Sequence, residues 1–376
     1  MELFDSYSFA FSNIQSIVIP KSLKIIANDA FNYCTKLHTV TFQKDSQLES
    51  IEDGAFAETN IKEITIPKHV KKIGKKAFYL CNFLERIDFE EGSEIHSICK
   101  NAFQSTYISY LEFPDNLIDL QEGWCNGTEN LYDIKISPKN TNFCYLNQEI
   151  IVGKSDANNE YYDTLLFANR YNETLKIPSF IKYIKPYAFS DTPSLLSIDF
   201  SEDSELISID KNAFYTAGIE SLNIPEKVEE LKDGWCTATI FFKSVSISEK
   251  NKNFKFLPNQ KKIMIGKSNK EQENFDVITF ACRDIKRALI PKYIKFIYSG
   301  VFADCELLSF IQFEQDSDCK YIGENSFSRT SIKYFCIPEK VITVGNYAFS
   351  NCYFLLCLEG LSETFTFSEL LFKNCD

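Results

Sequence analysis

The sequence predicts a solenoid, in which successive coils of chain stack along one continuous core and each coil carries a short parallel strand. Three observations support this fold class: an apolar pattern recurs along most of the chain, an aromatic residue closes each copy, and the spacing between these residues is nearly constant. The segment 64–103 contains two consecutive copies, which Phe78 and Phe103 close. Self-similarity at a short fixed period is the signature of repeat architectures.

The closing aromatic residues lie alternately about 22 and about 25 residues apart, a spacing that is typical of leucine-rich repeats. We therefore expect a single leucine-rich-repeat solenoid over residues 1–376, of the right-handed β/α superhelix type, with a column of stacked rings as its core. The aligned residues are Phe9, Phe31, Phe56, Phe78, Phe103, Trp124, Phe189, Phe214, Trp235, Phe302, Phe327 and Phe349.

Each coil begins with a segment of the form (I/L)xx(I/L/V)x(I/F), for example Leu84-Ile87-Phe89. Alternation with period two over so few residues predicts a short parallel strand, which we place on the concave face. A proline such as Pro67 often follows and ends the strand, because it has no N–H to donate. The next segment is expected to turn back across the convex side and to place its Phe in the core.

Two segments interrupt the repeat, at about residues 138–174 and 249–287. Each contains two apolar runs around a polar turn, which predicts a β-hairpin that projects from one edge of the solenoid. Residues 359–376 depart from the pattern and form a candidate C-terminal cap. The first coil begins near Phe9 without a polar cap, so a homodimer through the N-terminal coil is a candidate assembly.

Composition excludes several classes of partner. The chain has a formal net charge of −12, so neither a nucleic acid nor an anionic membrane is expected as its main partner. The longest apolar run, 352–358, is too short to span a membrane. The 13 cysteines are odd in number and form no CxxC pair, which favours a reducing cytoplasmic location. A location at the cell surface is the alternative.

No motif indicates catalysis, a cofactor or a metal. The triplet Gly-Lys-Ser occurs at 153–155 and 266–268, but the first glycine of a phosphate-binding loop is missing and a strand follows, so a hairpin turn is expected. His38, His69 and His96 occupy different registers of the repeat and should not converge. We therefore expect a protein that is not an enzyme.

Cysteines recur three residues after the closing Phe, in a slot that holds small residues in the other coils. We expect Cys34, Cys81, Cys305 and Cys352 to be buried thiols, and Cys319 likewise. Two Asn-x-Thr triplets, at Asn126 and Asn172, could accept a glycan only if the chain is secreted.

The candidate binding surface is the outward face of the predicted strands, where the residues on either side of the middle apolar position point away from the core. An ordinary solvated face explains the Ser, Thr and Asn residues of 174–246. Exposed apolar residues in the last third favour a contact surface there. The candidate contact residues are Arg86, Asp88, Tyr110, Glu112, Arg287, Leu289, Phe310, Gln312, Tyr334 and Cys336.

The pattern IPxxVxxIGxxAFxxCxxLxxIxF resembles the BspA-like, or treponemal-type, leucine-rich repeat of bacterial and protozoan surface antigens, over nearly the whole chain. The NxxF segment with its hairpin is also typical of that family. The resemblance implies adhesion or protein recognition through an extended surface. We therefore expect a protein partner, with an intracellular or cytoskeleton-associated scaffold as the alternative role.

Overall fold

The computed structural model describes residues 2–156, 158–360, 370–373 and 375, and within them the chain forms strands and turns but no helix. Each repeat is one coil with two strands. In the coil that begins at residue 63, the four-residue strand β6 (Glu63–Ile66) is followed by the two-residue strand β7 (Lys72–Ile73) and then by a turn that leads to β8 (Arg86–Phe89). The prediction of a leucine-rich-repeat solenoid with parallel strands is confirmed.

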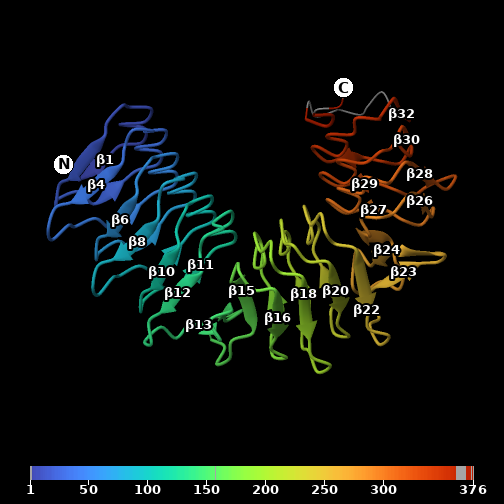
Figure 1. Ribbon diagram of the computed structural model, residues 1–376, viewed down its shortest axis with the longest axis horizontal. Helices are drawn as coiled ribbons and strands as arrows, with labels where there is room; N and C mark the ends of the chain where they lie inside the picture. Colours follow the sequence, from blue (N-terminus) through green and yellow to red (C-terminus); the bar gives the residue numbers. More distant parts are fainter. Residues whose placement is uncertain (1, 157, 361–369, 374, 376) are drawn as a thin grey trace. The chain divides into compact units, whose positions relative to one another are not determined.

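The chain divides into two compact units, Met1–Asn172 with Lys185–Thr192, and Glu173–Ile184 with Pro193–Asp376. In the first unit the long strands pair in parallel and in register, so that Glu63 faces Arg86 and Tyr110 faces Asp133. Figure 1 shows the long strands of this unit side by side. The long strands are β2 (Ser16–Ile19), β4 (Thr39–Phe42), β6, β8, β10 (Tyr110–Phe113) and β12 (Asp133–Ile136).

The two-residue strands form a second parallel sheet, which the sequence analysis did not predict. In the first unit they are β1 (Leu3–Phe4), β3 (Ile25–Ile26), β5 (Ser50–Ile51), β7, β9 (Ser97–Ile98) and β11 (Asp119–Leu120). In the described residues the segment between a short strand and the next long strand, such as 74–85, forms turns and contains no helix, so the β/α detail of the predicted type is wrong. Turns replace the helices.

The second unit repeats this arrangement. Its long strands are β16 (Thr174–Ile177), β18 (Ser197–Phe200), β20 (Ser221–Ile224), β22 (Ser244–Ile247), β26 (Arg287–Ile290), β28 (Phe310–Phe313), β30 (Tyr334–Cys336) and β32 (Cys357–Glu359). Its short strands are β17 (Tyr183–Ile184), β19 (Ser208–Ile209), β21 (Glu230–Leu231), β27 (Phe296–Ile297), β29 (Tyr321–Ile322) and β31 (Thr343–Val344).

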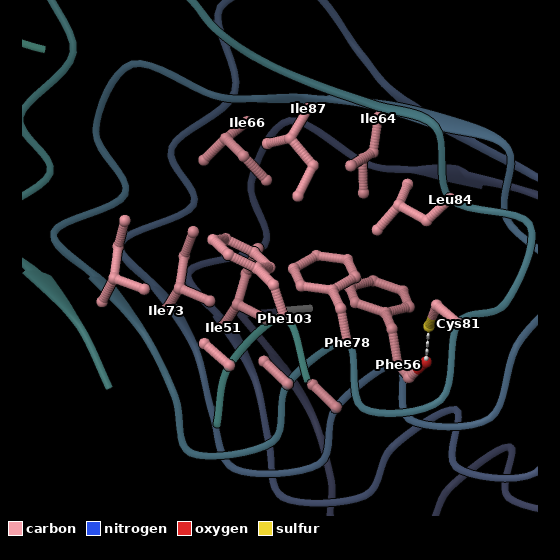
Figure 2. Packing of buried hydrophobic residues seen from close by; sticks show 14 of the residues in the cluster. Ile51, Phe56, Ile64, Ile66, Ile73, Phe78, Cys81, Leu84, Ile87 and Phe103 are labelled. Carbon is pink, nitrogen blue, oxygen red and sulfur yellow. Dashed lines mark hydrogen bonds between the residues drawn. The ribbon is translucent and has the colours of Figure 1, made fainter. Parts of the chain in front are cut away.

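Phenylalanine rings form the predicted column within each unit. Phe31 and Phe56 stack with centroids 5.2 Å apart and planes inclined by 5°, and Phe302 and Phe327 stack with the same values. Figure 2 shows Phe56, Phe78 and Phe103 in one row between the isoleucines of the two sheets. The near-parallel stacking follows from the repeat, because each coil presents its ring at the same height.

Backbone hydrogen bonds in the turn hold the closing phenylalanines of successive coils at a constant spacing. The N–H of Phe31 donates to the carbonyl of Ala55 in the next coil at 2.8 Å, and that of Phe56 donates to Ala77 at 2.8 Å. Residues two before and two after the ring adopt positive φ, such as Asp29 at 55°. A glycine is required where coils touch, because a Cβ on Gly74 would lie 2.4 Å from the backbone carbon of Glu52.

The two tryptophans do not occupy the ring position, and this prediction is wrong. The N–H of Phe103 donates to the carbonyl of Trp124, and that of Phe214 donates to Trp235, so both tryptophans stand where other coils have alanine. Cys125 therefore takes the ring position of its coil. Trp124 meets Phe103 edge-on, at 84°, and fills the space that the missing ring leaves.

The two insertions are antiparallel. The first comprises β13 (Phe143–Leu146), β14 (Ile150–Gly153) and β15 (Thr164–Ala168), and the second comprises β23 (Lys255–Leu257), β24 (Gln260–Gly266) and β25 (Val277–Ala281). They do not project as predicted. All residues of β14 and β25 are buried, and β25 pairs in parallel with β27, because both faces of these strands are apolar.

The candidate C-terminal cap, 359–376, falls largely outside the described residues, which omit 361–369, 374 and 376. Residues 370–373 and 375 keep the turn of the repeat. The Phe372 ring stacks on that of Phe349 at 6.0 Å and 19°, and the Cys375 Sγ donates to the Phe349 carbonyl at 2.8 Å.

Candidate protein-binding surface

The outward face of the long strands is built by simple alternation. In β8 the side chain of Ile87 is buried, whereas Arg86 is exposed and Asp88 is half-buried. Parallel, in-register pairing repeats this arrangement from strand to strand, so outward residues form rows across each sheet. The structure places all ten predicted contact residues on such rows, four in the first unit and six in the second.

In the first unit the predicted contact residues bind one another through an ion pair and a hydrogen bond. The Arg86 Nε lies 2.7 Å from an Asp88 carboxylate oxygen, and the Tyr110 hydroxyl donates to Glu112 at 2.8 Å. The Lys135 ammonium lies 5.4 Å from the centroid of the Tyr110 ring. Burial, followed by the Glu112 carboxylate, raises the pKa of Tyr110 to about 12. This patch is polar, and its side chains already have hydrogen-bond or ion-pair partners within it.

A groove of about 1260 Å³ crosses β4, β6 and β8 and shares Arg86 and Asp88 with this patch. Outward residues of all three strands form its floor, and loop residues that precede the strands form its rim. Phe83 stands at this rim with 52% of its surface exposed. The rim was not predicted from the sequence, although Phe83 is an aromatic residue in a loop slot that holds Asn60 in the preceding coil and Lys36 in the coil before that. The other rim residues include Lys36, Asn60, Lys62 and Glu85.

In the second unit the predicted residues form an apolar patch, defined here as Arg287, Leu289, Phe310, Gln312, Tyr334 and Cys336 on β26, β28 and β30. Arg287 faces Phe310 in the strand register, and its guanidinium carbon lies 4.2 Å from the Phe310 ring centroid. Leu289 and Tyr334 are 49% and 66% exposed. The patch combines apolar surface with a cation, as protein contact surfaces do.

A side chain of the insertion holds the edge of this patch in place. Gln260 accepts from the Leu289 N–H at 2.9 Å and donates its amide to the Leu289 carbonyl at 2.7 Å. The amide thus pairs with the strand edge as another peptide unit would. The position of Leu289 is fixed before any partner arrives.

The residues considered for catalysis have structural roles. Ser155 and Ser268 of the two Gly-Lys-Ser turns donate their hydroxyls to Asp163 and Asp276, at 2.6 and 2.9 Å, which closes a hairpin turn as predicted. His69 pairs with Glu94 at 3.0 Å, and His38 with Thr39. Among the described residues no group of three or more His, Cys, Asp or Glu side chains could hold a metal ion.

Cys34, Cys81, Cys305 and Cys352 of the small-residue slot are buried as predicted, and so is Cys319, which stands where other coils have Leu48 or Ile95. The Cys81 Sγ donates to the Phe56 carbonyl at 3.0 Å (Figure 2). Cys34 and Cys352 make the equivalent bond, to the carbonyls of Phe9 and Phe327, so these thiols join one coil to the coil before it.

The triplet at Asn126 is not available for glycosylation. The Asn126 side chain is buried, and the Thr128 hydroxyl is buried and donates to the Phe103 carbonyl at 2.9 Å. In the part of the chain that the structure describes, no helix has the length and apolar character to cross a membrane.

Comparison with known proteins agrees with this architecture. A family model described as "BspA type Leucine rich repeat region" matches the chain in 6 copies, over residues 2–146, 160–271 and 251–376. No curated protein matches the sequence.

Three solved structures share the fold. The pneumococcal vaccine antigen PcpA is 20% identical, over 84% of this chain and 80% of that one, with a TM-score of 0.59. A leucine-rich repeat protein from Eubacterium ventriosum ATCC 27560 is 20% identical, over 96% and 87%, with a TM-score of 0.63. A leucine rich cell surface protein from Faecalibacterium prausnitzii A2-165 is 19% identical, over 96% and 84%, with a TM-score of 0.52.

Proposed function

Because the chain belongs to the BspA-type leucine-rich-repeat family, we propose that it is a non-catalytic protein-binding protein that recognises its partner through the outward face of its long strands. The observation that carries this proposal is the apolar patch of the second unit. Leu289 and Tyr334 are exposed there on strands whose opposite face is fixed in the core. Neighbouring apolar groups in water on a rigid support are typical of an interface.

The support is preorganised, which favours binding. The strands are paired in register, Gln260 holds the Leu289 backbone, and Arg287 already lies over Phe310. Few groups of this chain would therefore lose conformational freedom when a partner binds. Less of the favourable contact free energy would be offset by this entropy loss, so the affinity would be higher. The groove across β4, β6 and β8 offers further surface on the corresponding face of the first unit.

Adhesion or recognition at the cell surface is the role that we place first. The relatives named as a vaccine antigen and as a cell surface protein have the same fold. An intracellular scaffold would use the same face. The identity of the partner separates the two roles, because adhesion requires an extracellular protein and a scaffold a cytosolic one.

The proposal is tested by affinity capture with the intact chain and with the double variant Phe310→Asp/Tyr334→Asp, followed by quantitative mass spectrometry and by reconstitution with the purified partner. Burying two carboxylates against an apolar contact should weaken binding at least about tenfold. The matched control is Tyr161→Asp/Ile342→Asp, which alters two side chains that are 77% and 75% exposed outside the patch. Equal capture by the patch variant and the intact chain would refute the proposal.

A further inference from the structure

A second feature borders the apolar patch: a pocket of about 550 Å³ in the second unit. Insertion residues on one side and the start of β26 on the other line it, and Arg287 belongs to both the pocket and the patch. The lining residues that matter for charge are Lys261, Lys262, Lys286 and Arg287, against the single carboxylate of Asp284.

Most of this positive charge has no carboxylate partner. Lys262 pairs with Asp284 at 2.5 Å, whereas none of the ion pairs found among the described residues includes Lys261, Lys286 or Arg287. The first unit provides the contrast, because Arg86 on the equivalent face is paired with Asp88. The pocket therefore presents a net positive charge on a chain whose net charge is −12.

The insertion contributes two of the four cations, Lys261 and Lys262, and it is richer in lysine than its counterpart in the first unit. Residues 249–275 contain seven lysines and three glutamates, whereas the corresponding segment 138–162 contains two lysines and three acidic residues. The two insertions have the same strand order, so the extra lysines are not needed to form the fold.

The exposed apolar surface narrows the class of ligand. Leu307, which lines the pocket, is 53% exposed, and Leu289 and Tyr334 continue the apolar surface beyond Arg287. A sulfated glycan or a nucleic acid would use the cations and leave this surface in water. A protein segment that carries both carboxylates and apolar side chains would use both features, and guanidinium groups bind carboxylates with two parallel hydrogen bonds.

We propose that this pocket receives an acidic segment of the protein partner, with its carboxylates on Lys261, Lys286 and Arg287 and its apolar side chains on Leu289 and Tyr334. The inference rests on the proposed protein-binding function and adds the chemistry of the partner to it. Because the cations are exposed, binding should weaken as salt rises.

The test uses fluorescence anisotropy with the full chain and a fluorescein-labelled dodecapeptide in which Glu alternates with Leu. We expect saturable binding that weakens several-fold between 50 and 200 mM NaCl. The variant Lys261→Glu/Lys286→Glu should bind at least tenfold more weakly, and Lys261→Gln/Lys286→Gln should fall between this variant and the intact chain. The control Lys227→Glu/Lys252→Glu makes the same charge change at exposed lysines outside the pocket and should bind as the intact chain does.

Three results would overturn the inference: no binding of the Glu-Leu peptide, equal binding of a peptide with Lys in place of Glu, or binding of a heparin hexasaccharide without binding of the peptide. Circular dichroism melting of each variant identifies any variant that fails to fold. If the Glu variant does not fold, the affinity of Lys261→Gln/Lys286→Gln for the peptide is compared with that of the intact chain instead. Affinity capture separates this inference from the proposed function. If Lys261→Glu/Lys286→Glu keeps a partner that Phe310→Asp/Tyr334→Asp loses, the pocket assignment fails and the binding function stands.

Discussion

At the scale of the residue, the closing phenylalanine determines how one coil holds the next. Phe78 is fully buried between Phe56 and Phe103, with ring centroids 5.5 and 5.8 Å away. Replacement by alanine removes the ring from both neighbours and leaves a cavity that the paired strands cannot close. We expect Phe78→Ala to lower the free energy of unfolding by about 3–5 kcal/mol, measured by urea denaturation.

The control for this prediction is Phe83→Ala, five residues further along the chain. Phe83 is half exposed at the groove rim, so its removal should change the free energy of unfolding by less than about 1 kcal/mol. An unchanged urea midpoint for Phe78→Ala would show that the ring column does not stabilise the array.

The ring column could be predicted from the sequence because residue type and interval repeat together. The tryptophans could not be placed in the same way, because their position depends on backbone conformation. Positive φ at Gly123 and Gly127 brackets Cys125 and shows that Trp124 stands one residue earlier. The sequence alignment placed Trp124 in the ring position because it is aromatic. The hydrogen bond from the Phe103 N–H to the Trp124 carbonyl shows that Trp124 occupies the alanine position instead.

At the scale of the element, each insertion is closed by one buried carboxylate. Asp276 is 1% exposed and accepts from the Ser268 N–H and hydroxyl and from the Gln272 amide, and the Lys295 ammonium lies 3.3 Å away. Asp276→Ala leaves these donors unpaired, and we expect it to cost about 3 kcal/mol. The turn should then open locally, so limited trypsin digestion should cleave after Lys267 and Lys270 at least tenfold faster.

The control for the insertion is Asp284→Ala. The ion pair of Asp284 with Lys262 is exposed, and such pairs contribute little to stability, so the rate of cleavage in the turn should not change. Slow cleavage of Asp276→Ala, equal to that of the intact chain, would mean that the strands alone hold the insertion closed.

The paired strands of the insertions were predictable from their apolar runs, but their burial and the row of two-residue strands were not. A strand of two residues such as Lys72–Ile73 is too short to show any periodicity, and only parallel pairing with its neighbours defines it. The outward face of the long strands was predictable because alternation in Arg86-Ile87-Asp88 fixes which side chains are exposed. The cationic pocket could not be predicted, because Lys261 and Lys286 line the same pocket only after the insertion has folded against the start of β26.

At the scale of the whole molecule, buried thiols recur in both units, and their ionisation links stability to pH. Burial raises the pKa of Cys81 and Cys236 to about 11 and that of Cys125 and Cys319 to about 12, from an ordinary value of 9.0. The folded chain thus holds these protons more tightly than the unfolded chain does. The stability that they contribute is complete below pH 9 and is lost as the pH rises through 11 to 12.

We expect the melting temperature to vary little between pH 7 and 8.5 and to fall steadily between pH 9 and 11, because above pH 9 the unfolded chain releases thiol protons that the folded chain retains. Added negative charge on a chain of net charge −12 would also lower stability, so the contribution of the thiols needs its own comparison. The variant Cys81→Ala/Cys236→Ala removes two of the buried thiols, one from each unit. Its melting temperature should fall less steeply over pH 9 to 11 than that of the intact chain, whatever its value at pH 7. Identical slopes for the two chains would show that the turn cysteines are packing residues whose ionisation does not affect unfolding.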